Sequence, residues 1–137
     1  LGTLRAVTGE CHSAQVGIGR AEGGIPGAER LEGHALLLRG VASRGGEEVP
    51  FEAWLDVDLY VEGIELDHRV DDEPGHLLVE VDLERWLRRV DFATAEPADG
   101  VGDPAILAEG TQAHNALGRG VDNTLAYRLR WVADGAM

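Results

Sequence analysis

The stretch from Val49 to Gly63 reads VPFEAWLDVDLYVEG and alternates with a period of two residues. Every odd position from 49 to 61 is apolar, and the even positions carry mostly acids and aromatic residues. Such a period places one set of side chains in a core and the other in solvent, which predicts a β-strand. The alternation is longer than most single strands, so we expect this segment to bend between two sheets.

A change of phase follows at Gly63. The apolar residues Ile64, Leu66 and Val70 occupy even positions, together with His68. One extra residue in a strand reverses the face that each side chain occupies, so we expect a bulge or sharp bend at Gly63. The turn-forming sequence DDEPG at 71–75 then precedes a second alternating run. Residues 64–83 are therefore predicted to form a hairpin.

The remaining patterns add more strands than helices. One short helix is expected after Asp82, in the sequence LERWLRRV, and one helical turn from Thr111 to Gly118. Further strands are expected at 4–7, 12–20, 34–42, 105–110 and 124–132, the third of these covered on both faces. Six to eight strands without a strand–helix rhythm predict one all-β domain over 1–137, an antiparallel β-sandwich or flattened barrel with one or two short helices.

The composition limits the range of functions. The chain has 12 basic residues, all arginine, against 25 acidic ones, for a net charge of −13. This charge repels nucleic acid and favours a partner with a basic surface. No apolar run approaches the roughly 20 residues of a transmembrane helix, and Cys11 is the single cysteine, so no intramolecular disulfide can form.

Catalytic motifs are missing from the sequence. There is no phosphate-binding loop, no dinucleotide-binding turn, no nucleophile elbow and no paired-cysteine zinc motif. The two serines, Ser13 and Ser43, lie outside any strained turn pattern, and Cys11 and His12 are neighbours on a predicted strand, which sends their side chains to opposite faces. We therefore expect a protein that is not an enzyme.

The histidines suggest a metal site as an alternative. His68 and His76 lie on opposite sides of the predicted hairpin turn and could approach diagonally. With His34, His114 or Cys11 they would supply imidazole and thiolate ligands, which suit copper or zinc. The plainer interpretation is that the histidines are scattered strand-end residues that bind backbone groups or water.

The acidic residues suggest two weaker alternatives. Calcium needs six to eight converging oxygens, which a flat strand face rarely supplies, so the acidic loop at 96–103 suits it better than Asp56 and Asp58. Aromatic residues beside these acids, Trp54 and Tyr60, would also suit a carbohydrate-binding face. Charge on an exposed strand more often protects it from pairing with other sheets.

The segment VEVDLERWLRRVDF at 79–92 resembles the C-terminal part of secreted bacterial β-sandwich lipoproteins and, loosely, the periplasmic copper-binding proteins associated with methanobactin uptake. The matching residues are Leu83, Trp86, Val90 and Asp91. The resemblance implies an exported sandwich domain, periplasmic or extracellular, whose precursor can carry a lipid anchor, and a copper site of histidine with a nearby tryptophan. The paired cysteines expected in many members are absent.

We therefore expect an exported, non-enzymatic β-sandwich that acts as a structural or protein-interaction module. Its contact face would comprise Trp54, Asp56, Asp58 and Tyr60, with the aromatic residues as anchors and the acids selecting a basic partner protein or a larger assembly. The alternative is a periplasmic copper- or zinc-binding protein that uses His68 and His76 with His34 or His114.

Overall fold

The computed structural model describes residues 8–100 and 102–135. The strand expected at 4–7 lies outside these residues. Of the described residues, 44% lie in strands and 20% in helices, with seven strands in sheets and two α-helices. The predicted all-β class is confirmed, and the arrangement is compatible with a sandwich-like fold.

The elements follow one another in an order dominated by strands. The strands are β1 (Gly9–Ile18), β2 (Leu36–Arg44), β3 (Glu47–Leu55), β4 (Leu59–Val70), β5 (Gly75–Val81), β6 (Ala105–Ile106) and β7 (Tyr127–Ala133). The α-helices are α1 (Leu83–Leu87) and α2 (Gln112–Val121), and the short 3₁₀ segments are η1 (Ala28–Leu31), η2 (Phe92–Thr94) and η3 (Thr124–Ala126).

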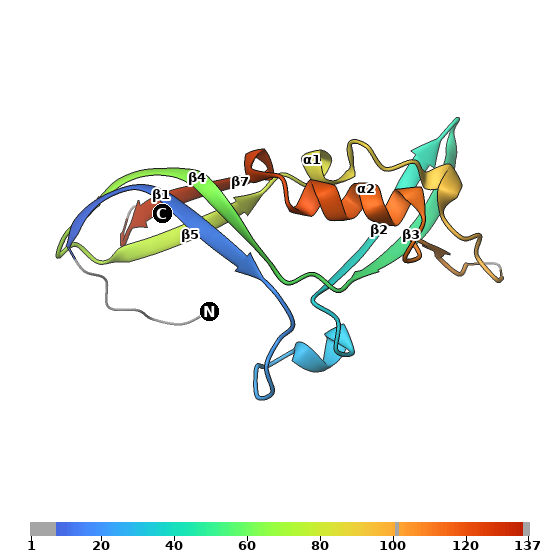
Figure 1. Cartoon of the computed structure of the whole chain (residues 1–137), viewed down its shortest axis with the longest axis horizontal. Helices are drawn as coiled ribbons and strands as arrows, with labels where there is room; N and C mark the ends of the chain where they lie inside the picture. Colours follow the sequence, from blue (N-terminus) through green and yellow to red (C-terminus); the bar gives the residue numbers. More distant parts are fainter. Residues whose placement is uncertain (1–7, 101, 136–137) are drawn as a thin grey trace.

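The strands form three small sheets within the described ranges. β1 pairs with β4 and β5 pairs with β7, both antiparallel, while β3 lies between antiparallel β2 and parallel β6. Figure 1 shows the first two sheets at one end of an elongated molecule and the β2–β3 hairpin at the other, with α2 lying along the middle. The long β3–β4 segment joins the two ends.

The predicted bend in the alternating stretch is confirmed. β3 ends at Leu55, β4 begins at Leu59, and the two strands belong to different sheets. The bulge expected at Gly63 is confirmed as well, because Gly63 has a φ of 72° and the β1–β4 register shifts between the pairs Ala14–Ile64 and Val16–Val61. Glycine adopts this positive φ without the steric cost that a side chain would impose.

The predicted hairpin over 64–83 is wrong. β4 pairs with β1, and β5 pairs with β7, so the turn at 71–75 joins two different sheets. Asp71 shapes this turn, since its Oδ1 accepts a hydrogen bond of 2.9 Å from the backbone N–H of Glu73. The alternation of a strand fixes its apolar face but does not name its neighbour, and strands remote in sequence provided the partners here.

The core lies between β3, the bulged part of β4 and the two helices. Apolar residues of the predicted inward phase are buried there, and the largest fully buried side chains are Leu55, Val61, Ile64, Leu107, Leu117 and Val121. The helices approach so closely that a Cβ added at Gly120 would lie 2.3 Å from the carbonyl oxygen of Trp86. Glycine is thus required at 120 for α2 to pack on α1.

Several expected elements differ in extent or in cover; for example, the strand expected at 105–110 is only β6, and the one expected at 124–132 begins at Tyr127, after η3. α2 runs to Val121 and does not stop at Gly118, although Thr111 caps it as expected, with its side chain accepting from the N–H of His114. α1 has its expected Asp82 cap but only five residues, of which Trp86 is buried. β2 is not covered on both faces, because Val41 is 61% exposed. No helix in the described part of the chain has the length and apolar character needed to cross a bilayer.

Candidate functional site

The predicted contact face divides between two places. Trp54 is the penultimate residue of β3 and Asp56 follows that strand, whereas Asp58 and Tyr60 lie beside the end of β1. Tyr60 is 64% exposed, and its ring lies over Gly17, where an added Cβ would be 2.9 Å from Cε1. The four side chains therefore do not form one flat strand face, because β3 and β4 belong to different sheets.

A small cavity lies where β3 meets α2 and the segment before it. It has a volume of about 200 Å³ and is lined by His34, Trp54, Asp56, Ile106, Leu107, Ala108, Glu109 and His114. One wall is apolar, from Ile106 to Ala108, and the other carries two imidazoles, two carboxylates and an indole. We call this cavity the Trp54 pocket.

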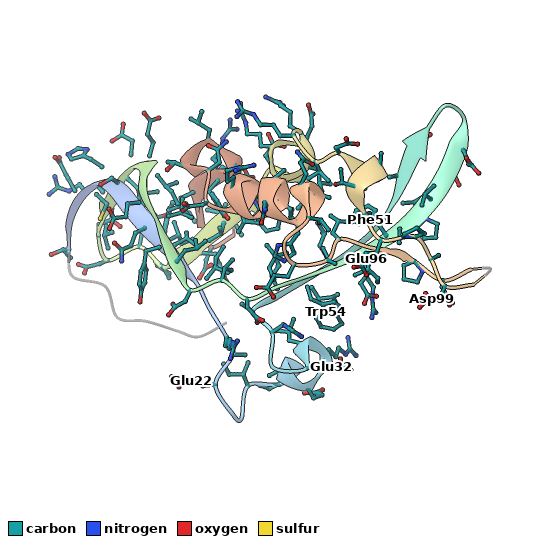
Figure 2. All side chains as sticks on the ribbon, turned by 45° about the vertical axis from the view of Figure 1, so that its right-hand side comes forward. Glu22, Glu32, Phe51, Trp54, Glu96 and Asp99 are labelled. Carbon is teal, nitrogen blue, oxygen red and sulfur yellow. The ribbon has the colours of Figure 1, made fainter. Side chains whose placement is uncertain are left out.

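A hydrogen bond from the indole N–H holds Trp54 in place. Its indole Nε1–H donates to Glu52 Oε1 at 2.6 Å, and Arg39 Nε donates to Glu52 Oε2 at 2.8 Å. Figure 2 shows the Trp54 ring between β3 and the lower segment that bears Glu32. Because Glu52 occupies the only donor of the indole, the ring offers the pocket its apolar π surface.

His34 and Asp56 form a second fixed pair. His34 Nδ1 lies 3.1 Å from Asp56 Oδ1, and the imidazole ring is tilted against Trp54 with a centroid distance of 5.0 Å. A carboxylate only accepts, so Nδ1 is the donor in this hydrogen bond. Arg20 Nη2 approaches the same Oδ1 at 3.4 Å, and the Asp56 side chain keeps 43% of its surface exposed.

α2 completes the pocket from the other side. His114 Nε2 donates to the backbone carbonyl of Trp54, at 3.1 Å, which fixes the tautomer and ties α2 to the end of β3. Glu109 is exposed at the rim, just before the Thr111 cap. It forms no ion pair within the described ranges.

The four predicted metal histidines do not form one cluster. His34 and His114 line the Trp54 pocket, whereas His68 stacks on Trp131, with ring centroids 4.6 Å apart, and His76 pairs with Asp134 at 2.7 Å. The predicted hairpin that would have joined His68 to His76 is not formed. Within residues 8–100 and 102–135, no group of three His, Cys, Asp or Glu side chains has the geometry of a metal site.

Cys11 and the acidic segment at 96–103 were the other predicted metal-binding features. Cys11 lies opposite His68 in the β1–β4 register, although the four-histidine site is absent. At the start of the acidic segment at 96–103, the backbone of Glu96 exchanges hydrogen bonds of 2.7 and 2.9 Å with Ile106. Neither place gathers the converging oxygens that calcium requires.

A larger and shallower groove lies between the bulge of β4, the end of β5 and η3. It has a volume of about 620 Å³, and its lining includes Glu65, Glu80, Asp82, Arg85 and Arg128. Three of these charges are paired within the chain, since Arg130 binds Glu80 at 3.1 Å and Arg85 binds Asp82 at 3.2 Å. The other two, Glu65 and Arg128, have opposite signs, so the groove favours a cationic ligand less than the Trp54 pocket does.

Comparison of the chain with protein-family models, with curated proteins and with solved structures gives no match in any of the three. The sequence had singled out Trp54, Asp56, His34 and His114, but as members of two different predicted sites. It gave no sign of Arg20, Glu109 or the wall from Ile106 to Ala108. These residues reach the pocket through contacts between distant segments, which no local pattern encodes.

Proposed function

We propose that this protein is a non-enzymatic binding module that receives an arginine side chain of a basic partner protein in the Trp54 pocket. The observation that carries the proposal is the meeting of an indole ring with the half-exposed carboxylate of Asp56 in one small cavity. A guanidinium group is planar, stacks on aromatic rings and donates to carboxylates, so it matches both features.

The size of the pocket supports a single side chain as its ligand. About 200 Å³ is smaller than the usual 300–1,000 Å³ of small-molecule sites. Asp56 and His34 keep 43% and 37% of their side-chain surface exposed, so the pocket opens directly to solvent and to a partner's surface. The net charge of −13 would attract a basic partner over longer distances and speed its association.

The lining also supports a binding role over a catalytic one. The His34–Asp56 pair has the form of an oriented base, but no residue that lines the pocket carries a hydroxyl or thiol nucleophile. We place Asp58 and Tyr60 outside the primary contact. They flank the pocket along the chain, where they can widen the interface with a protein partner.

Charge-neutral variants test the proposal, with the tripeptide amide Gly-Arg-Gly as probe and NMR titration as readout. A single side chain should bind with a dissociation constant near the millimolar range, roughly −4 kcal/mol. Asp56→Asn removes the carboxylate, so we expect binding about tenfold weaker or more. The matched control Asp58→Asn makes the same change two residues away, outside the pocket, and should bind almost as the natural chain does.

Arg20 provides a test of opposite sign. Its exposed guanidinium already approaches Asp56 and competes with the probe, while an ion pair between exposed groups adds little stability. Arg20→Ala should therefore tighten peptide binding and leave unfolding nearly unchanged. Equal weakening by Asp56→Asn and Asp58→Asn, or equal binding of Gly-Glu-Gly and Gly-Arg-Gly, would contradict the pocket as the site.

A transition-metal role is the second candidate, favoured by one observation. His34 and His114 line the same pocket, and Nε2 of His34 and Nδ1 of His114 are not used in these hydrogen bonds. A third ligand would have to move toward them, because no set of three is in place among the described residues. Elemental analysis of protein purified without chelators separates the candidates, since stoichiometric copper or zinc supports the metal role.

We also propose that the domain acts outside the cytoplasm, in the periplasm or the extracellular space. The support is the resemblance of residues 79–92 to exported lipoproteins. In this chain the matching residue Trp86 is the buried residue of α1. Cell fractionation of the native source tests this directly, and recovery in the cytoplasmic fraction contradicts it.

A further inference from the structure

β5 has an unusual surface for an outer strand. All six residues from 76 to 81 are exposed, and the aliphatic ones keep 37–49% of their surface in solvent: Leu77, Leu78, Val79 and Val81. Outer strands are normally protected by lysine, proline, a bulge or a covering segment. β5 has neither lysine nor proline, pairs with β7 in an unbroken register, and has no second strand beside it in the described ranges.

The hydrogen bonds at the two ends of β5 show which backbone groups face outward. The N–H of Asp82 donates to Ala126 at 2.8 Å, and the N–H of Asp134 donates to Pro74 at 3.0 Å. Bonded pairs recur at every second residue of an antiparallel ladder, so the even residues of β5 bond to β7. The odd residues, Gly75, Leu77, Val79 and Val81, therefore direct their N–H and C=O groups to the open edge.

We infer that β5 pairs with β5 of a second copy of this chain, antiparallel and about a two-fold axis at Leu78. In this register Gly75 faces Val81 and Leu77 faces Val79, so every outward backbone group of the strand finds a partner. The interface is isologous, as a closed dimer requires. It is a distinct interface from the proposed arginine site and uses none of the residues of the Trp54 pocket.

Charge complementarity selects this register. With Leu78 on the axis, His76 of each copy lies opposite Glu80 of the other, on the same face of the sheet. Each has a partner in its own chain, Asp134 for His76 and Arg130 for Glu80, and still keeps 71% and 45% of its side-chain surface exposed toward a second copy. A shift by two residues, the next register that keeps the odd groups bonded, places Glu80 or His76 opposite Leu78 and leaves outward groups at the ends unpaired.

Two copies of a chain with net charge −13 also repel one another. Salt screens such repulsion between distant surface charges but weakens backbone hydrogen bonds and apolar contacts far less. The dimer should therefore become more stable as the salt concentration rises. An association driven by the acidic surface and a basic partner would show the opposite dependence.

Sedimentation of the full chain over a range of concentrations tests the inference. The natural chain should form a dimer, and Val79→Pro should weaken association at least about 100-fold, because it removes two symmetry-related donors and places a ring in the seam. The N–H of Val79 does not bond to β7, so proline there removes no bond within the chain. Val79→Thr keeps the donor and the β-branched shape and should still dimerise.

Leu77→Glu gives a second variant that leaves the backbone unchanged and should also favour the monomer. Amide exchange supplies the register, since the N–H groups of Leu77, Val79 and Val81 should be protected in the dimer alone and those of Leu78 and Glu80 in both states. A monomer at all concentrations overturns the inference. A folded Val79→Pro variant that still forms the dimer also overturns it. Protection of the amides of Leu77, Val79 and Val81 in dilute monomer does the same.

Discussion

β3 and β5 carry the same kind of pattern but have different environments. In β3 the alternating residues Phe51, Ala53 and Leu55 are at most 5% exposed. In β5 the alternating residues Leu77, Val79 and Val81 keep 39–49% of their surface in solvent. An alternating sequence therefore shows which side chains share a face, whereas the burial of that face depends on the elements that cover it.

β3 and β5 differ in burial because they have different neighbours. β3 lies between two other strands and beneath α2, whose His114 bonds to the end of β3 and whose Leu117 belongs to the same core. β5 has β7 on one side only. Figure 1 shows β5 beside β7, with its last residues leading directly into α1. The covered strand β3 contributes to the Trp54 pocket. The strand β5 leaves one edge without a neighbouring strand among the described residues.

A matched pair of leucines gives the largest expected difference between the two strands. Leu55 is 1% exposed and Leu77 is 47% exposed. We expect Leu55→Ala to lower the free energy of unfolding by about 2–5 kcal/mol and Leu77→Ala by less than about 1 kcal/mol. Urea unfolding of dilute protein measures both. Equal losses would show that β5 is covered as well as β3.

Tyr127 lies opposite Val81 in the β5–β7 register and is buried, in contrast to the exposed residues of β5. Burial raises the pKa of Tyr127 from 10.0 to about 12, and its hydroxyl donates to the carbonyl of Val121. The phenol ionises first in the unfolded chain, so its contribution is complete below pH 10 and is lost between pH 10 and about 12. The loss should be on the order of 2–3 kcal/mol.

Unfolding experiments across this alkaline range check the prediction. Tyr127→Phe should be less stable below pH 10 but should lose less stability above it. Tyr60→Phe changes the exposed tyrosine and serves as the control. Its stability should fall above pH 10 as steeply as that of the natural chain. A natural chain whose stability does not fall above pH 10 would contradict a buried phenol at this position.

Two glycines of α2 test the packing that covers β3. A Cβ at Gly120 would collide with the backbone of Trp86, whereas a Cβ at Gly118 meets open space. Gly120→Ala should therefore cost about 1–3 kcal/mol, and Gly118→Ala should stabilise by about 0.5–1 kcal/mol through its higher helix propensity. Thermal unfolding distinguishes the two. Stabilisation by both would show that α2 does not pack tightly on α1.

The predictable features of this fold are those that local chemistry determines. The phase change at Gly63, the caps at Asp82 and Thr111 and the inward phase of β3 depend on neighbouring residues, and the structure confirms each. The hairpin over 64–83 failed because strand pairing is decided by contacts across the whole chain. The expected approach of His68 to His76 depended on that hairpin.

The candidate site shows the same division. Trp54 and Asp56 could be selected because acids and aromatic residues on an alternating stretch are conspicuous in sequence. Their joining with His34 and His114 could not be predicted, because four separate segments of the chain meet at the pocket. The separation of Tyr60 from Trp54 follows from the three residues between β3 and β4, where the chain passes from one sheet to another.

The most direct test of the proposed function is to locate the probe arginine on the protein. Intermolecular nuclear Overhauser effects between the arginine methylene protons of Gly-Arg-Gly amide and the protein's aromatic rings would measure this. The pocket predicts contacts to the ring protons of Trp54 and none to those of Tyr60. Contacts to Tyr60 without Trp54, or no contact to either ring at saturating peptide, would contradict the Trp54 pocket as an arginine-binding site.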